Sequence, residues 1–236
     1  MKLKLFFIAF FSLSQSFYAQ ITKGLIVPKE ANVYKFCCAY IPESGIQVYN
    51  KPNGKVLGEI VLDSSKDHQN KPHKIFLGIQ NHLKPIEHPN VKITGDDIIA
   101  LVYIEQDSNF VKLQNGYWIK VGELEDKGLQ IVNWMQYLIE RSPEVIGYYA
   151  KEPGLQLRES PTENSDLILE LKGDLLEIKL THKVKGLWCK VIVTQYSDHP
   201  CSSKGNFEEI KLKTYTGWIQ LLSTDLTPNV TFYKTC

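Results

Sequence analysis

Histidine and cysteine are the first residue types to consider, because they supply most protein metal ligands and many catalytic nucleophiles. Four of the six histidines fall in one lysine- and proline-rich segment: His68, His73, His82 and His88. Their spacing fits neither the i, i+4 pair of a helical zinc site nor a zinc-finger pattern. The neighbouring lysines repel a divalent cation, and the segment contains no cysteine. We therefore predict a polar surface loop here, with no bound metal and no other cofactor.

The chain has five cysteines, and none shows the CxxC spacing of a structural zinc site. A Cys–His hydrolase needs a cysteine beside a histidine base and a third group that orients the base. Cys189 instead lies inside an apolar run, where packing or a local disulfide with Cys201 suits it better. No segment outside the two β-domains and the helix described below is large enough for a peptidase domain. The Gly-x-Ser-x-Gly, HExxH and phosphate-loop motifs are absent. We therefore predict no catalytic residues and a protein that is not an enzyme.

Tyrosine and tryptophan are the remaining candidates for a binding site. Their flat rings with a polar edge can stack on peptides or sugars. They cluster at predicted strand ends and turns. The predicted ligand-binding residues are Tyr40, Tyr49, Tyr117, Trp118, Tyr149, Tyr215 and Trp218. The alternative for each is a place in the core with a half-exposed ring.

These aromatic residues belong to two copies of one sequence pattern. Residues 40–49 align with residues 149–158 without a gap. Three further landmarks follow in the same order: Gly95-Asp96 matches Gly173-Asp174, residues 110–113 match 188–191, and Trp118-Ile119 matches Trp218-Ile219. Four matches in one order indicate an internal duplication.

The pattern within each copy is typical of β-strands. Ile46 and Val48 alternate with polar residues, as Leu155 and Leu157 do in the second copy, which indicates half-buried strands. Asn115-Gly116 stands between two short apolar runs and predicts a hairpin turn. Short strands joined by Gly, Pro and Asn turns favour a small barrel or sandwich.

The order of these features resembles the bacterial SH3-like (SH3b) family. In that family an N-V-R-x-x-P-type start precedes a G-D turn, a W-x-K-V strand and a G-W-V closing strand. The second copy fits more closely, whereas the first has Tyr49 in place of the arginine and Phe110 in place of the first tryptophan. The resemblance implies two small SH3-like β-barrels and a binding role, with cell-wall peptide as the first ligand to consider.

The duplication divides the chain into domains. We expect a mainly β protein with one SH3-like domain at residues 20–124 and a second at 143–236, joined by an α-helix within 125–142. Apolar residues at helical spacing support that helix, with Asp126 as its N-cap and Ser142-Pro143 as its end. The apolar residues are Ile131, Trp134, Met135 and Leu138.

Each domain also carries an insertion, and inserted loops on a rigid scaffold are common locations for specific function. The first domain has extra residues at about 63–94, which include the histidine-rich segment. The second has a hairpin insertion at about 197–213.

The N-terminus has the features of a secretory signal peptide. Lys2 and Lys4 precede an apolar run at residues 5–13, and a polar stretch then leads to Ala19. The apolar run is too short to span a membrane. We predict a cleaved signal peptide at residues 1–19 and a secreted or periplasmic mature protein.

The net charge of the chain bears on which classes of partner it can bind. The formal net charge is +1, so nucleic acid is not an expected partner. We expect an exported, non-enzymatic binding protein whose tandem SH3-like modules recognise a cell-wall peptide or glycan, or an envelope protein. The alternative is an envelope enzyme or metal-dependent protein, such as a Cys/His-based hydrolase, with its site in the inserted loops. In neither case do we expect a transmembrane span.

Overall fold

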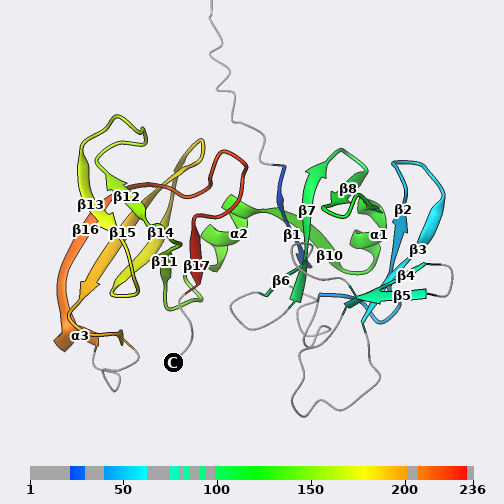
Figure 1. Cartoon of the computed structure of the whole chain (residues 1–236), viewed down its shortest axis with the longest axis horizontal. Helices are drawn as coiled ribbons and strands as arrows, with labels where there is room; N and C mark the ends of the chain where they lie inside the picture. Colours follow the sequence, from blue (N-terminus) through cyan, green and yellow to red (C-terminus); the bar gives the residue numbers. More distant parts are fainter. Residues whose placement is uncertain are drawn as a thin grey trace, which may run out of the picture.

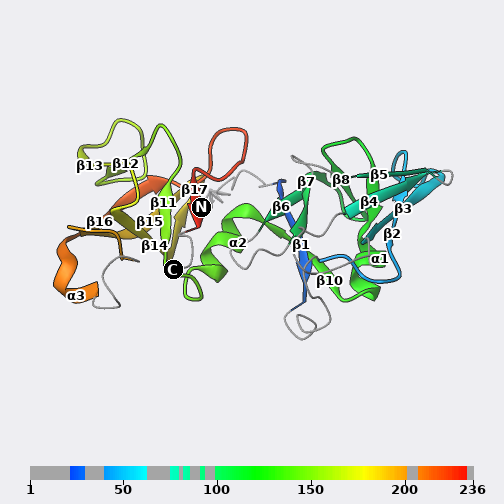
Figure 2. The ribbon, with the colours of Figure 1, turned by 60° about the horizontal axis from the view of Figure 1, so that its bottom comes forward.

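The computed structural model describes residues 22–29, 40–62, 75–79, 82–85, 91–93, 99–200 and 207–232. These residues form two antiparallel sheets, with the helix α2 (Trp134–Arg141) between them (Figure 1). The same arrangement is seen after a rotation in Figure 2, where α2 again lies between the two groups of strands. The predicted mainly β class is therefore confirmed.

The first sheet has ten strands in the order β10-β1-β7-β8-β9-β2-β3-β4-β5, with β6 paired to β7. The helix α1 (Val121–Asp126) joins β9 to β10. The strands are β1 (Gly24–Pro28), β2 (Ile46–Tyr49), β3 (Val56–Leu62), β4 (Ile75–Ile79), β5 (His82–Pro85), β6 (Val91–Ile93), β7 (Ile99–Gln106), β8 (Phe110–Leu113), β9 (Trp118–Lys120) and β10 (Leu129–Asn133).

The second sheet has seven strands in the order β13-β12-β16-β15-β14-β11-β17. The short helix α3 (Phe207–Ile210) precedes β16. The strands are β11 (Tyr148–Ala150), β12 (Leu155–Arg158), β13 (Leu167–Leu171), β14 (Leu176–Lys185), β15 (Trp188–Tyr196), β16 (Lys211–Gln220) and β17 (Val230–Phe232).

The two sheets share one strand order. The first runs β10-β1-β7-β8-β9-β2-β3, and the second runs β17-β11-β14-β15-β16-β12-β13. Every strand of the second sheet thus has a counterpart in the first, to which β4, β5 and β6 are additions. An internal duplication predicts such a shared order. The pairings between the described strands leave both orders open, so the closed barrel remains a prediction.

The residue registers agree as well as the strand order. Tyr49 pairs with Trp118 between β2 and β9, and Arg158 pairs with Trp218 between β12 and β16. The β2–β3 pairing shifts register just before Tyr49, and the β12–β13 pairing shifts just before Arg158. The repeat landmarks therefore lie at equivalent positions of the two sheets, apart from Gly95, which is outside the described residues.

Equivalent strands also bury equivalent side chains. Val111 and Ile119 pair between β8 and β9, and Cys189 and Ile219 pair between β15 and β16. All four side chains are fully buried. In β2 apolar residues alternate with polar or half-exposed ones and one face lies in the core, whereas all five residues of β1 are buried. The core continues through α2 into both sheets.

The helix predicted within 125–142 is present as α2, but it is shorter than the apolar spacing predicts. β10 pairs with β1 along its whole length, and α2 begins only at Trp134. Its N-cap is Asn133, not Asp126, because the Asn133 side chain accepts a hydrogen bond of 2.9 Å from the Gln136 N–H. The β-branched pair Ile131-Val132 favours a strand once β1 offers a partner. The first sheet therefore extends to Asn133, beyond the predicted limit at residue 124.

The insertions also differ from simple loops. The first contains β4 and β5, which continue the sheet from β3, and β6, which pairs with β7. His82 begins β5, whereas His68, His73 and His88 lie outside the described residues. The second insertion extends the β15–β16 hairpin to the pair Tyr196 and Lys211. None of the described helices is long and apolar enough to cross a membrane.

Candidate functional site

The predicted aromatic residues do not gather in one site. Tyr40 is buried in the core of the first sheet. Tyr117 and Tyr215 are half-buried and pack against the core. Tyr149 lies in β11 and lines a separate hollow with Asp174. The seven residues therefore do not form a single aromatic platform.

Two of them belong to a row of side chains across the first sheet. Tyr49 on β2 and Trp118 on β9 are cross-strand partners, and Lys112 on β8 is the next partner of Trp118. The Lys112 Nζ lies 5.3 Å from the centre of the Trp118 ring and 3.1 Å from the Glu105 carboxylate. Cross-strand partners point to the same face of a sheet, so these residues form one continuous surface.

The second sheet has an equivalent row. Lys190, Trp218 and Arg158 are successive cross-strand partners. Trp218 is half-buried, as Trp118 is. The predicted closing-strand tryptophans thus have the same environment in both sheets, between a lysine and the residue at the end of β2 or β12.

Cys189 is a free, fully buried thiol, which speaks against the predicted disulfide. Its Sγ donates a hydrogen bond of 3.3 Å to the Thr181 carbonyl. Burial raises the pKa of Cys189 to about 11, so the thiolate needed by a nucleophile is scarce at neutral pH. Cys201 lies outside the described residues.

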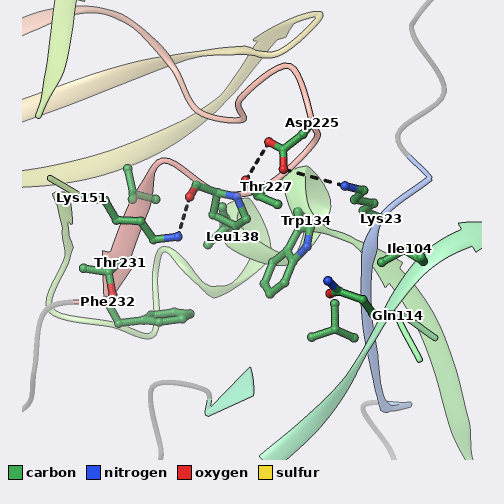
Figure 3. Close-up of a pocket in the computed structure, with 13 residues that line it drawn as sticks. Lys23, Ile104, Gln114, Trp134, Leu138, Lys151, Asp225, Thr227, Thr231 and Phe232 are labelled. Carbon is green, nitrogen blue, oxygen red and sulfur yellow. Dashed lines mark hydrogen bonds and ion pairs between the residues drawn. The ribbon is translucent and has the colours of Figure 1, made fainter. Parts of the chain in front are cut away.

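Within the described part of the chain, no group of three or more His, Cys, Asp and Glu side chains could hold a metal ion. A cavity between the two sheets is the better candidate site (Figure 3). It has a volume of about 310 Å³. It is lined by Lys23, Val102, Ile104, Gln114, Trp134, Leu138, Lys151, Asp225, Thr227, Pro228, Val230, Thr231 and Phe232.

Aromatic and aliphatic side chains form the floor of this cavity. Trp134 and Leu138 come from α2, and Phe232 comes from β17. The Phe232 ring contacts Tyr148 at a centroid distance of 5.2 Å, and Tyr148 donates a hydrogen bond of 2.7 Å to the Leu138 carbonyl. Because these contacts link α2 to two strands of the second sheet, the floor is held in a fixed shape.

Charged side chains of both signs surround the mouth. The Lys23 Nζ lies 3.9 Å from the Asp225 carboxylate, and the Lys151 Nζ donates a hydrogen bond of 2.6 Å to the Pro228 carbonyl. Hydrogen bonds from Ser223 and Thr227 lower the pKa of Asp225, which keeps this carboxylate ionised. The cavity can therefore accept a ligand with an apolar part and with carboxylate or amine groups.

The aromatic pattern in the sequence did not identify this cavity. In the sequence, Trp134 and Leu138 stand out only as apolar residues at helical spacing. Lys23, Lys151 and Asp225 have no distinctive spacing, and they meet only because β1, β11 and the turn before β17 converge beside α2. A local sequence pattern cannot show that these three distant segments meet.

Comparisons of the chain with protein-family models, with curated proteins and with solved structures gave no match.

Proposed function

We propose that this chain is an exported, non-enzymatic binding protein built from two diverged SH3-like repeats, with a cell-wall peptide as the ligand of the cavity between them. The shared strand order and register of the two sheets support the duplication. The Lys-flanked apolar run before Ala19 supports export, although it lies outside the described residues.

The cavity between the repeats is the observation that carries the proposal. Ligand sites in proteins are concave and mostly apolar, with a few placed polar groups that orient the ligand. Here Trp134 offers an apolar contact, and Lys23 and Asp225 offer one charge of each sign. A cell-wall peptide presents short apolar side chains together with free carboxylates and amines. A carboxylate of the ligand binds beside Lys23 or Lys151, and an amine binds beside Asp225.

Sedimentation with purified peptidoglycan tests this function. The mature chain, beginning at Gln20, is incubated with insoluble peptidoglycan, and the pellet and the soluble products are then analysed. We expect the protein in the pellet and no released fragments. Release of soluble muropeptides would contradict the non-enzymatic assignment.

A cavity-filling variant tests the site. Gln114 lies in the exposed turn before β9, and its side chain lines the cavity. Gln114→Trp should fill the cavity and exclude the ligand, which weakens binding by at least about tenfold, or about 1.4 kcal/mol. Lys183→Trp is the control, since Lys183 is exposed and does not line the cavity. Equal binding by both variants would place the ligand elsewhere.

A further inference from the structure

In the first repeat, α1 covers the part of the β2 edge that precedes Tyr49, where no strand pairs with β2. The pairing between β2 and β9 consists of Tyr49 and Trp118 alone. The Gln47 N–H, two residues earlier, donates a hydrogen bond of 2.8 Å to a carboxylate oxygen of Glu123. The Lys127 Nζ donates a hydrogen bond of 2.6 Å to the Gly45 carbonyl. A carboxylate and an ammonium group thus provide hydrogen-bond partners for the backbone N–H and carbonyl groups of this edge.

The two groups are one helical turn apart on the same segment. Glu123 lies in α1, and Lys127 is its C-cap residue. Their side chains form an i, i+4 ion pair with a distance of 3.3 Å. Both side chains are largely buried against β2, and Leu124 between them is fully buried. The first repeat therefore shows how an acidic and a basic side chain of one helix bind this edge.

The second repeat has the same backbone edge. β12 pairs with β16 only through Arg158 and Trp218, as β2 pairs with β9. The turns that precede the two edges also agree: Gly154 donates to the Lys151 carbonyl at 2.8 Å, and Gly45 donates to the Pro42 carbonyl at 2.9 Å. The register of β12 with β13 gives Gln156 the position that Gln47 has against β3.

None of the helices that the structure describes covers this second edge. After β16 the chain continues through Leu221 and Leu222 into the turn that contains Asp225, which lines the cavity between the repeats. Among the described residues, no side chain binds the Gln156 N–H or the Gly154 carbonyl. A hollow of about 670 Å³ lies there instead, compared with about 400 Å³ beside α1. We call it the edge groove; its lining includes Gly154, Gln156, Arg158, Glu170, Trp188 and Gln220.

The charged side chains of the edge groove differ from those of its counterpart: Arg158 stands where the first repeat has Tyr49, and Glu163 and Lys172 also line the groove. Tyr49 donates a hydrogen bond of 3.1 Å to the Gln47 side chain, and Arg158 makes the equivalent bond to the Gln156 side chain. In the first repeat, burial and the nearby Glu123 carboxylate raise the pKa of Tyr49. A carboxylate at the equivalent place in the edge groove would meet a guanidinium group instead of a phenol. Charge-assisted hydrogen bonds to carboxylates are about twice as strong as neutral ones.

We propose that the edge groove binds a helical segment of a partner protein in which an acidic residue is followed four residues later by a lysine or arginine. Its carboxylate accepts hydrogen bonds from the Gln156 N–H and the Arg158 guanidinium, and its basic side chain donates to the Gly154 carbonyl. The guanidinium has five N–H donors, and its bonds to Ser165 and Gln156 use two of its nitrogens. This partner site is separate from the cavity between the repeats and goes beyond the proposed function.

The first repeat provides the probe for a direct test. A peptide with blocked ends and the sequence of residues 120–128, KVGELEDKG, is titrated into the isotopically labelled chain. We expect saturable shifts of the Gln156 and Arg158 amide signals with a Kd on the order of 1 mM, because so short a helix is marginal by itself. A peptide with Glu123→Gln should bind at least about fivefold more weakly, since the neutral amide loses the charge-assisted bond.

Protein variants distinguish binding at the edge groove from nonspecific electrostatic attraction of the peptide. Arg158→Gln should weaken binding of the acidic peptide by at least about fivefold. Lys183→Gln is the matched control, because Lys183 is exposed and lies away from the groove, and it should leave the Kd unchanged. Gln114→Trp should also leave it unchanged, so failure of the cavity proposal does not affect this result.

Three results would overturn the proposal. One is the absence of a saturable shift at Gln156, and another is equal affinity for the acidic peptide and its Glu123→Gln form. The third is a shift at Gln156 that grows with protein concentration in the absence of peptide. That result would show that a second copy of the chain occupies the groove.

Discussion

The hydroxyl of Tyr148 donates a hydrogen bond of 2.7 Å to the backbone carbonyl of Leu138, and both residues are buried. Tyr148 belongs to β11, whereas Leu138 belongs to α2, which directly follows β10 of the first sheet. This bond therefore joins the second repeat to the helix that ends the first. Burial raises the pKa of Tyr148, so the phenol remains the donor throughout the neutral and mildly alkaline range.

Tyr148→Phe should lower the free energy of unfolding by about 1–2 kcal/mol. The variant keeps the ring but leaves a buried carbonyl with one partner fewer, which costs about 1–3 kcal/mol in proteins. Urea unfolding followed by tryptophan fluorescence measures the change. Tyr117→Phe is the control, because Tyr117 is half-buried and no hydrogen bond of its hydroxyl is found in the described structure. A loss of equal size in both variants would contradict the role of the Tyr148 bond.

Gly154→Ala should be more destabilising than Gly116→Ala. Both glycines have positive φ, +116° and +88°, where an L side chain is strained by about 1–2 kcal/mol. A Cβ at residue 154 would also lie 2.7 Å from the Leu171 carbonyl oxygen, whereas a Cβ at residue 116 meets nothing within 4 Å. We expect the two variants to differ by more than about 1 kcal/mol in thermal or urea unfolding. Equal losses would mean that the turn before β12 can shift without cost.

Local sequence patterns were sufficient for the strands that define each repeat. Alternating apolar residues and the glycine turns predicted β2 and β12, and the structure places both at equivalent positions. Local patterns did not predict the full structure of residues 125–142. The helical spacing of apolar residues there does not reveal that β1, from a distant part of the chain, pairs with Ile131. The cavity and the edge groove were missed for the same reason, since both arise where distant segments meet.

Trp118→Ala and Trp218→Ala should each destabilise the protein, although by less than loss of a fully buried tryptophan. Full burial of a large apolar side chain is worth about 1.5–3 kcal/mol, and both rings are half-buried. We expect losses of about 1–3 kcal/mol in each case, measured as a lower Tm and a lower urea midpoint. Unchanged melting together with lost peptidoglycan binding would instead identify these rings as recognition residues.

Cys189 should make stability depend on alkaline pH. Burial raises the pKa of Cys189 to about 11 in the folded protein, above its value in the unfolded chain. The folded state therefore keeps a proton that the unfolded state releases as pH rises, so this contribution to stability is full below about pH 9 and is lost between about pH 9 and 11. The measurement is urea unfolding at a series of pH values.

Cys189→Val isolates this effect from the titration of other groups. The first repeat has Val111 at the equivalent position, fully buried and paired with Ile119 as Cys189 is paired with Ile219. Valine should therefore fit the second core with a change of less than about 1.5 kcal/mol at pH 7. The difference in unfolding free energy between the variant and the original chain should shift in favour of valine as pH rises from 9 to 11. A difference that stays constant across that range would show that the thiol ionises equally in both states, and that its burial has no influence on its pKa.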